Sequence, residues 1–547
     1  MDGATAPEPG LTALTAALRS SLDSLNEALA LARLLRSYSS AMVSTDSRNE
    51  TAQAASSLLA PSMTGLSQAL ALFDAAVALI DLDSLGADPV VRAHRYRLDR
   101  TKARAHTLLS PEEESLLAEL ADSGPLAWSR LHGNLTSQIV VEFKGAKLPM
   151  AKLQTMGRDP DPDVRREAYH AEQAAWKEHE TALVAAMNSV KGHSVRVNAR
   201  RGWPKPLDEA VFTNAIDRTI LDAMMAAAHE SFPDFRRFFR AKARLLGHGG
   251  GLPWWDLYAP LGRFKTWPYA EGCEFVVRHF RTYSDKLADF AQMTFDQNWV
   301  DAEPRAGKRG GAYCTGLTPG VSRVFMNYEP SFLSVSTLAH ELGHAYHGLC
   351  LRERTELQSS LPMTLAETAS IFCETLIKQA ALAEAHGDER MALLDATLMG
   401  PTGVVVDITS RFLFEQEVCE RRNERELSAA ELCDAMRRAQ VATYGDGLDP
   451  EWLHPYAWAG KPHYYARDFY NFPYMFGLLF GLGLYEVYRA EPNGFHERYD
   501  ALLSDTGMAS ALELGQRFGI DLRETDFWRR SLATVRKDID DFVSLAS

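Results

Sequence analysis

The stretch LAHELGHAYHGLC, residues 338–350, carries the strongest structural signal in this chain of 547 residues. It contains His340 and His344, which a helix places one turn apart on the same face. Two imidazoles at this spacing can reach one zinc ion, and the adjacent Glu341 is positioned to act on a water molecule. We therefore predict a helix here that carries two metal ligands and a general base.

A catalytic zinc ion usually takes three protein ligands and leaves a fourth position for water, so a third ligand is required. The carboxylates that follow in the sequence are Glu353, Glu356, Glu367 and Glu374. The first two belong to the charged run RERTE, which is typical of a solvated turn. Glu367 and Glu374 follow Pro362, where a helix can begin, and their spacing of about two turns places both on one face. One of them would bind the metal and the other would orient a ligand histidine, and the spacing leaves both assignments open.

His347 lies one helical turn beyond His344 and is a further candidate ligand. A fourth protein ligand would close the site to water, so we interpret His347 as lying behind the ligands or on the substrate side. The extended metzincin pattern would need glycine at position 347 and histidine at position 350. The sequence has His347 and Cys350 at these positions, which excludes that pattern.

Charge and cysteine usage restrict the partners and the compartment that we expect. The 72 acidic and 58 basic residues give a formal net charge of −14, which argues against nucleic acid or an anionic membrane as the main partner. The N-terminal segment lacks the features of a signal peptide, and the most apolar later stretch, 472–485, is shorter than the roughly 20 residues that span a bilayer. The six dispersed cysteines form no C-x-x-C pair, which is typical of free thiols in a reducing compartment. We expect a cytoplasmic protein with no nucleic-acid or membrane partner.

The hydrophobic pattern is helical over most of the chain. Residues 11 to about 245 are rich in Ala, Leu, Glu and Arg at helical spacing, and helical patterning returns from Ser331 to the end. Between them, residues 310–328 carry β-branched and aromatic residues in short runs that predict two strands. We expect a mainly α fold with a small sheet.

The zinc motif followed by LAETASIFCE, residues 365–374, resembles the thimet oligopeptidase and oligoendopeptidase F family of zinc metallopeptidases, and looks closest to the oligoendopeptidase F branch. Further matching segments are NAIDRTILDAM (214–224), WVDAEPRAGKRGGAYC (299–314), VFMNY (324–328) and PHYYARDFYNFPYMFGLLFGLGLY (462–485). The resemblance is specific over the C-terminal two thirds of the chain and extends to the N-terminal part only in its helical character.

This resemblance implies a mainly α, two-lobed helical zincin of the gluzincin type. It implies a small β-sheet beside the active-site helix and a deep central cleft. It also implies an N-terminal helical lobe over residues 1–198 and a zinc peptidase catalytic region over residues 199–547.

The resemblance also implies roles for the motif residues. His340, His344 and Glu367 match the ligands of one zinc ion. Glu341 matches the catalytic base, and Glu374 matches an acidic residue expected behind the metal.

The aromatic segment that follows residue 460 resembles the part of the family that faces the metal from across the cleft. His463, Tyr470 and Tyr474 correspond to the catalytic His and Tyr residues there. Tyr464 and Tyr465 are close competitors, which we assign to substrate binding, and the spacing leaves open which tyrosine contacts the oxyanion.

The segment VFMNY looks like the edge strand along which an extended peptide lies, adding itself to the sheet by main-chain hydrogen bonds. The predicted substrate-binding residues in this segment are Phe325, Met326, Asn327 and Tyr328.

The resemblance implies a zinc-dependent endopeptidase that hydrolyses internal bonds of short oligopeptides, with metal-activated water and Glu341 as general base. A dipeptidyl carboxypeptidase-like exopeptidase would share the zinc motifs, and a non-catalytic helical binding scaffold is the alternative outside enzymes. A gluzincin aminopeptidase would be expected to show G-x-M-E-N before the zinc helix, and the sequence has none. The expected partners are oligopeptide substrates, and both a monomer and a homodimer are compatible with the sequence.

Overall fold

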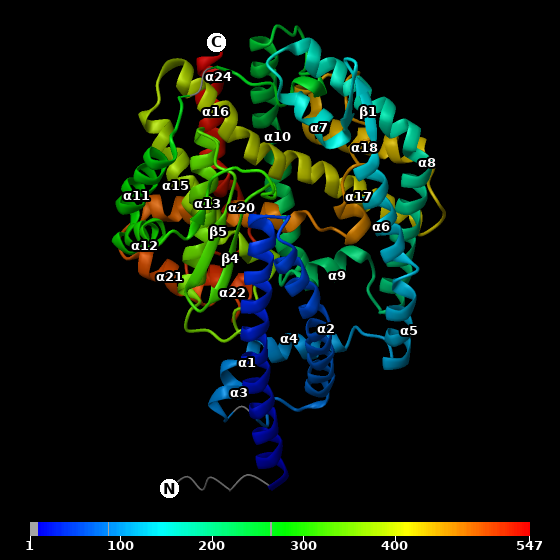
Figure 1. The fold of residues 1–547 in the computed structure, drawn as a ribbon, viewed down its shortest axis with the longest axis vertical. Coiled ribbons are helices and arrows are strands. Elements are labelled where there is room, and N and C mark those ends of the chain that lie inside the picture. The colour runs from blue at the N-terminus through cyan, green and yellow to red at the C-terminus, as the bar shows by residue number, and fades with distance from the viewer. Residues whose placement is uncertain (1–8, 86, 263–264) are drawn as a thin grey trace. The chain divides into compact units, whose positions relative to one another are not determined.

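A computed structural model of the chain describes residues 9–85, 87–262 and 265–547. Helices dominate these residues, and the strands form two small sheets (Figure 1). The prediction of a mainly α fold with a small sheet is therefore confirmed.

The described chain divides into two compact units, each built from three separate segments. Unit 1 comprises residues 1–108, 266–377 and 488–518, and unit 2 comprises 109–265, 378–487 and 519–547. Helix α8 (Pro162–Arg200) runs through the predicted boundary between residues 198 and 199, and both units draw on both sides of it. The two compact units therefore have other bounds than the predicted N-terminal lobe and catalytic region, whose division at residues 198 and 199 stays a prediction.

Unit 1 combines helices from the N-terminus with the motif region. Its helices are α1 (Pro9–Thr45), α2 (Glu50–Leu79), α3 (Pro89–Ala93), α4 (Arg95–Ala105), α11 (Tyr269–Tyr283), α12 (Asp285–Asp296), α13 (Phe332–Cys350), α14 (Met363–Ala366), residues 368–377 of α15 (Thr368–Glu384), α21 (Phe495–Ser504) and α22 (Ala511–Gln516). Its strands are β3 (Val300–Asp301), β4 (Tyr313–Thr318) and β5 (Val321–Phe325).

Unit 2 is built around the long helices α8 and α10. Its helices besides α8 are α5 (Pro111–Ala121), α6 (Pro125–Gln138), α7 (Met150–Thr155), α9 (Pro206–Thr213), α10 (Arg218–Leu245), the rest of α15, α16 (Gly387–Pro401), α17 (Ile408–Arg422), α18 (Ala429–Tyr444), α19 (His463–Ala466), most of α20 (Phe472–Ala490), α23 (Thr525–Ser531) and α24 (Ala533–Leu545). Short 3-10 turns at Met156–Arg158, Trp254–Asp256 and Gly445–Gly447, and a π-helical turn at Thr402–Asp407, complete the helical part. Strands β1 (Val140–Phe143) and β2 (Ala146–Pro149) form an antiparallel hairpin.

The sheet of unit 1 lies beside α13, as the resemblance implies. Its strand order is β3-β5-β4, with β5 parallel to β3 and antiparallel to β4, and α13 packs against both β4 and β5. The prediction that VFMNY is the edge strand is wrong, because β5 is the central strand. The main-chain N–H groups of Met326 and Tyr328 continue the pairing beyond β5 by donating to Asp301 and Ala302.

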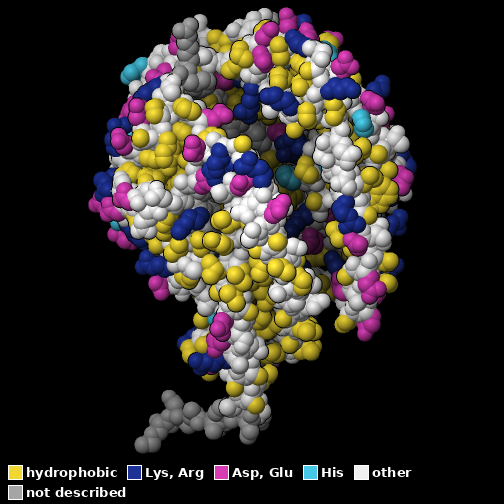
Figure 2. All heavy atoms as spheres, in the orientation of Figure 1, with side chains coloured by type: hydrophobic (Ala, Val, Ile, Leu, Met, Phe, Trp, Pro, Cys, Tyr) yellow, Lys and Arg dark blue, Asp and Glu magenta, His cyan; other side chains and the backbone are white. Residues whose placement is uncertain are grey.

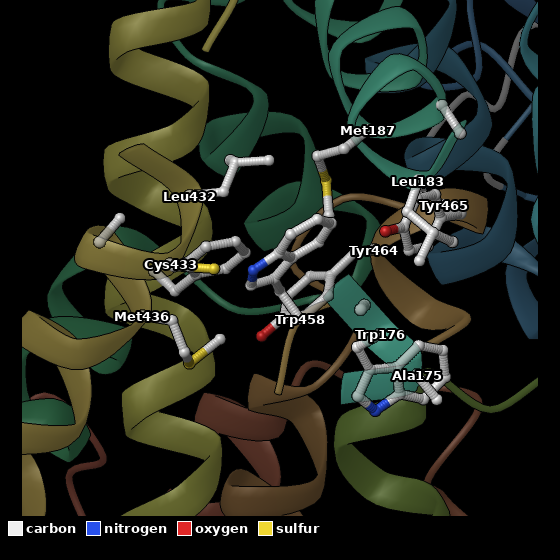
Figure 3. Packing of buried hydrophobic residues seen from close by; sticks show 14 of the residues in the cluster. Ala175, Trp176, Leu183, Met187, Leu432, Cys433, Met436, Trp458, Tyr464 and Tyr465 are labelled. Carbon is white, nitrogen blue, oxygen red and sulfur yellow. The ribbon is translucent and has the colours of Figure 1, made fainter. Parts of the chain in front are cut away.

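A large part of the core of unit 2 is formed by aromatic residues from segments far apart in the sequence. Trp176 of α8, Trp458 and the two tyrosines of α19 are each no more than 2% exposed. Figure 3 shows them packed with side chains of α18 such as Leu432 and Met436. This core fixes the start of the aromatic segment that carries His463.

Among the described residues, two helical stretches are long and apolar enough, by length and composition, to cross a membrane. They are Glu50–Leu79, which is α2, and Gly387–Arg422, which joins α16 to α17. Just over half of the apolar window in the second stretch, 56%, is buried, as in the core helix of a soluble protein. Helix α2 instead exposes Leu58, Leu72 and Leu79, and Figure 2 shows hydrophobic side chains gathered over the lower part, where α1 and α2 lie. Length and composition alone make either stretch weak evidence for a membrane partner.

Unit 2 contains a buried carboxyl group that makes its stability depend on pH. Burial raises the pKa of Asp538 on α24 from 3.8 to about 6, although Gln379 donates a hydrogen bond that opposes the shift. The protonated form is therefore favoured in the folded state. The corresponding stability is present below the unfolded pKa and is lost as the pH rises through about 6.

We expect Asp538→Asn to raise the melting temperature more at about pH 8 than at about pH 5, because the variant cannot ionise. A shift of this size corresponds to roughly 3 kcal/mol at most. Melting curves at the two pH values measure the effect, with the exposed Asp540→Asn as the matched control on the same helix. An equal change in melting temperature at both pH values would contradict the assignment.

Candidate metal centre and active site

Helix α13 begins with a side-chain cap and presents the two motif histidines on one face. The hydroxyl of Ser331 accepts a hydrogen bond from the main-chain N–H of Ser334, which satisfies one of the free donors of the first turn. The rings of His340 and His344 lie side by side, with centroids 5.0 Å apart. The one-turn spacing predicted from the sequence is therefore present in the structure.

Glu367 joins the two histidines from the junction between α14 and α15. Its Oε2 lies 3.3 Å from the Nε2 atoms of both His340 and His344. A tetrahedral zinc ion with ligand bonds of about 2.0–2.1 Å separates neighbouring ligand atoms by about 3.3–3.4 Å. The three side chains therefore have the donor types and the spacing to Glu367 that one zinc ion requires.

Glu374 lies behind His340, and one oxygen of its carboxylate faces the imidazole ring. Its Oε2 is 3.1 Å from His340 Nδ1, and its Oε1 accepts a hydrogen bond of 3.0 Å from the hydroxyl of Ser336. A carboxylate on Nδ1 leaves Nε2 free to bind a metal and holds the ring in place. The geometry thus distinguishes the two carboxylates that the spacing alone left equivalent.

The two carboxylates also set the local potential. Burial lowers the pKa of His340, but its hydrogen bonds to Glu367 and Glu374 outweigh burial and raise the pKa to about 10. The negative potential that favours a proton at this position also favours a divalent cation.

A close approach between two helices positions Glu367 against the histidines. A Cβ added at Gly343 would lie 2.6 Å from the carbonyl oxygen of Ala369 and from the Cα of Ser370, on α15. Only glycine permits this distance between the helices. The hydroxyl of Ser370 in turn donates to Glu367 Oε2 at 2.7 Å. Ser336 and Ser370 are site residues that we did not identify from the sequence, because isolated serines carry no motif.

Glu341 lies between His340 and His344 in the sequence. Its side chain is buried, at 6% exposed, and one of its carboxylate oxygens, Oε2, has no hydrogen-bond partner among the described residues. Burial raises the pKa of Glu341, while His340 and His344 partly oppose the shift. A carboxylate with a free acceptor atom and raised proton affinity is suited to take up a proton.

The other acidic and imidazole candidates lie outside the ligand group. The Nε2 of His347 is 2.8 Å from the Thr506 hydroxyl, and burial followed by the charge of His344 lowers its pKa to about 4. Glu356 forms an ion pair with Arg33 at 2.8 Å, and Glu353 is largely exposed. His347 therefore connects α13 to the chain after α21.

A second cluster, within unit 2, contains the predicted catalytic residues of the aromatic segment. The rings of His463 and Tyr470 lie 4.5 Å apart, and the Tyr474 hydroxyl donates to the Tyr470 hydroxyl at 3.2 Å. The Nδ1 of His463 is 2.9 Å from Oδ1 of the buried Asn471, so Nδ1 carries the proton and Nε2 is the free acceptor. Burial lowers the pKa of His463, and the charges of Arg411 and Lys461 add to this.

The turn before Tyr470 is held by buried charges. Asp468 accepts hydrogen bonds from Lys191 at 2.8 Å and from Ser194, and Lys191 also pairs with the buried Glu415. The next residue, Phe469, has a φ of +48°, a left-handed conformation that L-residues rarely adopt. The buried ion pairs keep the chain in this strained turn, which directs Tyr470 toward His463.

Tyr464 and Tyr465 lie in the core of unit 2. Each is 1% exposed, and their hydroxyls have no hydrogen-bond partner among the described residues. Tyr465 stacks on His132 with ring centroids 3.7 Å apart, and Tyr464 packs against Phe414 (Figure 3 labels both tyrosines). Because these rings fill the core, we assign both tyrosines to packing rather than to substrate contact, which corrects the expectation from the sequence.

The predicted substrate-binding residues at the end of β5 and directly after it also make contacts within unit 1. Phe325, Met326 and Tyr328 are buried, and the Tyr328 hydroxyl donates to the Trp267 carbonyl at 2.9 Å. The side-chain amide of Asn327 donates to the carbonyl oxygens of residues 309 and 311. A peptide that extends this sheet would therefore pair with β4 rather than β5, because β4 is an edge strand of the described sheet.

Comparisons with known proteins identify a family over most of the chain. The family described as "Peptidase family M3" matches residues 155–534, and a domain described as "Oligopeptidase F" matches residues 81–140. An oligoendopeptidase F homolog of Lactococcus lactis is 25% identical over 456 residues, which cover 81% of this chain and 75% of the relative. Oligopeptidase PepF of Bacillus subtilis is 22% identical over 459 residues, covering 81% of this chain and 68% of the relative.

Solved structures share the fold. A crystal structure from Chlamydophila abortus, described as a peptidase, superposes with a TM-score of 0.85 and 20% identity, covering 97% of this chain and 91% of that one. Oligoendopeptidase F from Enterococcus faecium superposes with a TM-score of 0.71 and 18% identity, covering 96% and 92% of the two chains.

We expect Gly343→Ala to destabilise unit 1 and to weaken zinc binding, because the added methyl group must push the start of α15, and with it Glu367, away from α13. Overpacking of this kind costs about 1–3 kcal/mol, and a displaced ligand about tenfold in metal affinity. Thermal melting and zinc titration measure the two effects. Gly348→Ala on the same helix is the control, since its Cβ would meet only the Ser322 hydroxyl at 3.4 Å. Equal zinc affinities of the two variants would contradict this role of Gly343.

Proposed function

Because the chain belongs to peptidase family M3, and is thus a metallopeptidase, we propose that it hydrolyses internal bonds of short oligopeptides with one zinc ion. The family and its relatives support peptidase activity on oligopeptides, and the names of the relatives support endopeptidase action. The zinc ion, the catalytic base and the position of the cut are parts of the proposal.

The convergence of His340, His344 and Glu367 is the observation that carries this proposal. It supplies three protein ligands from two packed helices, and Glu341 lies next to the first of them with an acceptor atom free. A structural zinc site would instead be expected to use four protein ligands. The three-ligand set therefore favours a catalytic zinc ion over a purely structural one.

When bound at these ligands, zinc would polarise the scissile carbonyl and lower the pKa of a water molecule toward about 7. Glu341 accepts the proton of the attacking water and then delivers it to the departing amine. Glu374 and Ser336 keep His340 in the tautomer and orientation that a ligand needs.

The cluster of unit 2 supplies hydrogen-bond donors for the reaction in this proposal. Tyr470 and Tyr474 present neighbouring hydroxyls, and donors of this kind stabilise the negative charge that develops on the scissile carbonyl oxygen. His463, held by Asn471 and close to the charges of Arg411 and Lys461, belongs to the same surface of the unit.

We further propose that the enzyme acts in the cytoplasm and takes no nucleic-acid or membrane partner. All six cysteines are free thiols in the structure, as expected for a reducing compartment. The acidic balance of the chain, with a net charge of −14, is unfavourable for phosphate-rich surfaces.

A dipeptidyl carboxypeptidase would use the same ligands, so the cleavage products decide between the two activities. The purified enzyme with zinc is incubated with unstructured peptides of increasing length, blocked at both ends or free, and the products are mapped by mass spectrometry. Internal cuts in end-blocked peptides support the endopeptidase. Removal of C-terminal dipeptides alone, lost on end-blocking, would refute it in favour of the exopeptidase.

We expect Glu341→Gln to lower kcat by at least about 100-fold and to keep zinc bound, because the amide cannot accept the proton yet leaves the ligands in place. Hydrolysis of a quenched fluorescent peptide and metal analysis of the same sample test this, and a chelator should abolish wild-type activity until zinc is restored. Glu353→Gln, at an exposed position, is the matched control. Wild-type turnover by Glu341→Gln would show that another group is the base.

We expect Tyr474→Phe to reduce kcat with a smaller change in KM, since its hydroxyl is proposed to act on the developing charge. Loss of one such donor costs on the order of 100-fold. Steady-state kinetics measure both constants, and Tyr38→Phe, exposed on α1, is the control. A change in KM alone would place Tyr474 in substrate binding instead.

A further inference from the structure

Unit 2 contains a cavity of about 300 Å³ that the proposed mechanism does not use. It lies between α8, the 3-10 turn at Trp254–Asp256, the start of α17 and the loop that precedes His463. Its volume is at the lower end of the range for small-molecule sites, about 300–1,000 Å³, and suits a single amino-acid residue.

Aromatic side chains form much of the cavity wall. They are Tyr169, Trp176, Trp254, Trp255, Tyr258 and Tyr456. The rings of Tyr169 and Trp255 lie 5.4 Å apart, so they pack as a continuous apolar surface. Such a wall suits an apolar or aromatic side chain.

Glu172 supplies a fixed acceptor on the same wall. Its Oε1 accepts hydrogen bonds from Gln154 at 2.8 Å and Trp176 at 3.0 Å, and His454 Nε2 lies 3.4 Å away. Burial raises the pKa of Glu172, but the charge of His454 and these hydrogen bonds outweigh it and lower the pKa to about 2. The second oxygen, Oε2, has no hydrogen-bond partner among the described residues. An ionised carboxylate with one free oxygen can accept an N–H group of a ligand.

Lys461 is the cation of this cavity that forms no close ion pair with a described residue, although the carboxylates of Asp407 and Glu172 act on its charge. Arg165 pairs with Asp256 at 2.7 Å, and Arg411 pairs with Asp407. The ammonium group of Lys461 forms no ion pair or hydrogen bond with any residue in the described ranges, although the side chain is half-buried. Burial lowers the pKa of Lys461 and the charge of Arg411 adds to this, while the carboxylates of Asp407 and Glu172 oppose it only in part. Buried charges in proteins are ordinarily paired, so a ligand carboxylate would complete this arrangement.

We propose that this cavity binds the C-terminal residue of a peptide, with its carboxylate on Lys461, its amide N–H on Glu172 and an apolar or aromatic side chain against the tryptophans. The residue can belong to a substrate or to a released product, which share this chemistry. Whether the bound residue comes from a substrate or from a product rests on the proposed peptidase function. The binding of the residue itself does not depend on turnover.

The binding test compares N-acetyl-L-phenylalanine with N-acetyl-L-phenylalaninamide, which lacks only the carboxylate. Calorimetric titration of the zinc-loaded wild-type enzyme should show at least about tenfold tighter binding of the acid, as a charge-assisted hydrogen bond would give. Tryptophan fluorescence should change on binding, because three tryptophans line the cavity wall.

We expect Lys461→Met to lose the preference for the acid, and Lys461→Arg to keep it to within about threefold. Lys177→Met, at an exposed position of α8, removes the same charge elsewhere in unit 2 and is the control. Circular dichroism establishes that each variant is folded. Equal binding of acid and amide to the wild type, or an unchanged preference in Lys461→Met, would overturn the proposal.

A kinetic experiment identifies whether the bound carboxylate belongs to a substrate or to a released product. The KM of a quenched fluorescent peptide is measured with a free and with an amidated C-terminus, in the wild type and in Lys461→Met. If amidation raises KM in the wild type alone, the substrate's own end occupies the cavity. If KM is unaffected while the acid still binds in a Lys461-dependent way, a released product is the occupant. An enzyme that fails to turn over would refute the proposed function and leave the titration result unaffected.

Discussion

The close approach of α13 to the start of α15 is the constraint on which the proposed metal centre depends. At Gly343 the two helices are so near that a single methyl group would collide with main-chain atoms of Ala369 and Ser370. Because Glu367 immediately precedes this contact, the distance between the helices sets the distance from its carboxylate to His340 and His344. Of the two unspecified positions of the H-E-x-x-H motif, position 343 must therefore remain glycine if Glu367 is to reach His340 and His344.

Local sequence spacing predicted the parts of the site that lie on α13 and the start of α15. Residues one or two turns apart on a helix share a face wherever the helix packs. His340, Glu341 and His344, and the pair Glu367 and Glu374, could therefore be identified as candidates without a structure. Spacing could not decide which glutamate binds, since that depends on how α15 meets α13. The mainly helical class and the small sheet could also be predicted from the sequence, because hydrophobic periodicity indicates helices and strands directly.

Predictions that depended on long-range partners were less successful. VFMNY has the composition of a strand, but its central place in the sheet is decided by residues 299–302, which pair on one side of it. Tyr464 and Tyr465 neighbour the proposed catalytic His463 in sequence, yet their rings point into a core made with α8 and α17. The buried Lys191, which holds Asp468 and with it the left-handed Phe469, could not be linked to that turn from a position more than 270 residues earlier in the chain. Cavities such as the one around Lys461 are likewise properties of packing and leave no motif.

The division of each unit into three segments has a consequence for biosynthesis. Helices α23 and α24, at the end of the chain, pack against α10 within unit 2, whose first residues are synthesised some four hundred positions earlier. A ribosome releases the chain from its N-terminus onward, so the part of the unit 2 core that α23 and α24 cover stays open until these helices emerge. The face of α10 that packs against them remains exposed until then. A premature stop codon just before residue 525 would therefore remove both helices from unit 2, although every residue proposed for metal binding or catalysis would still be present.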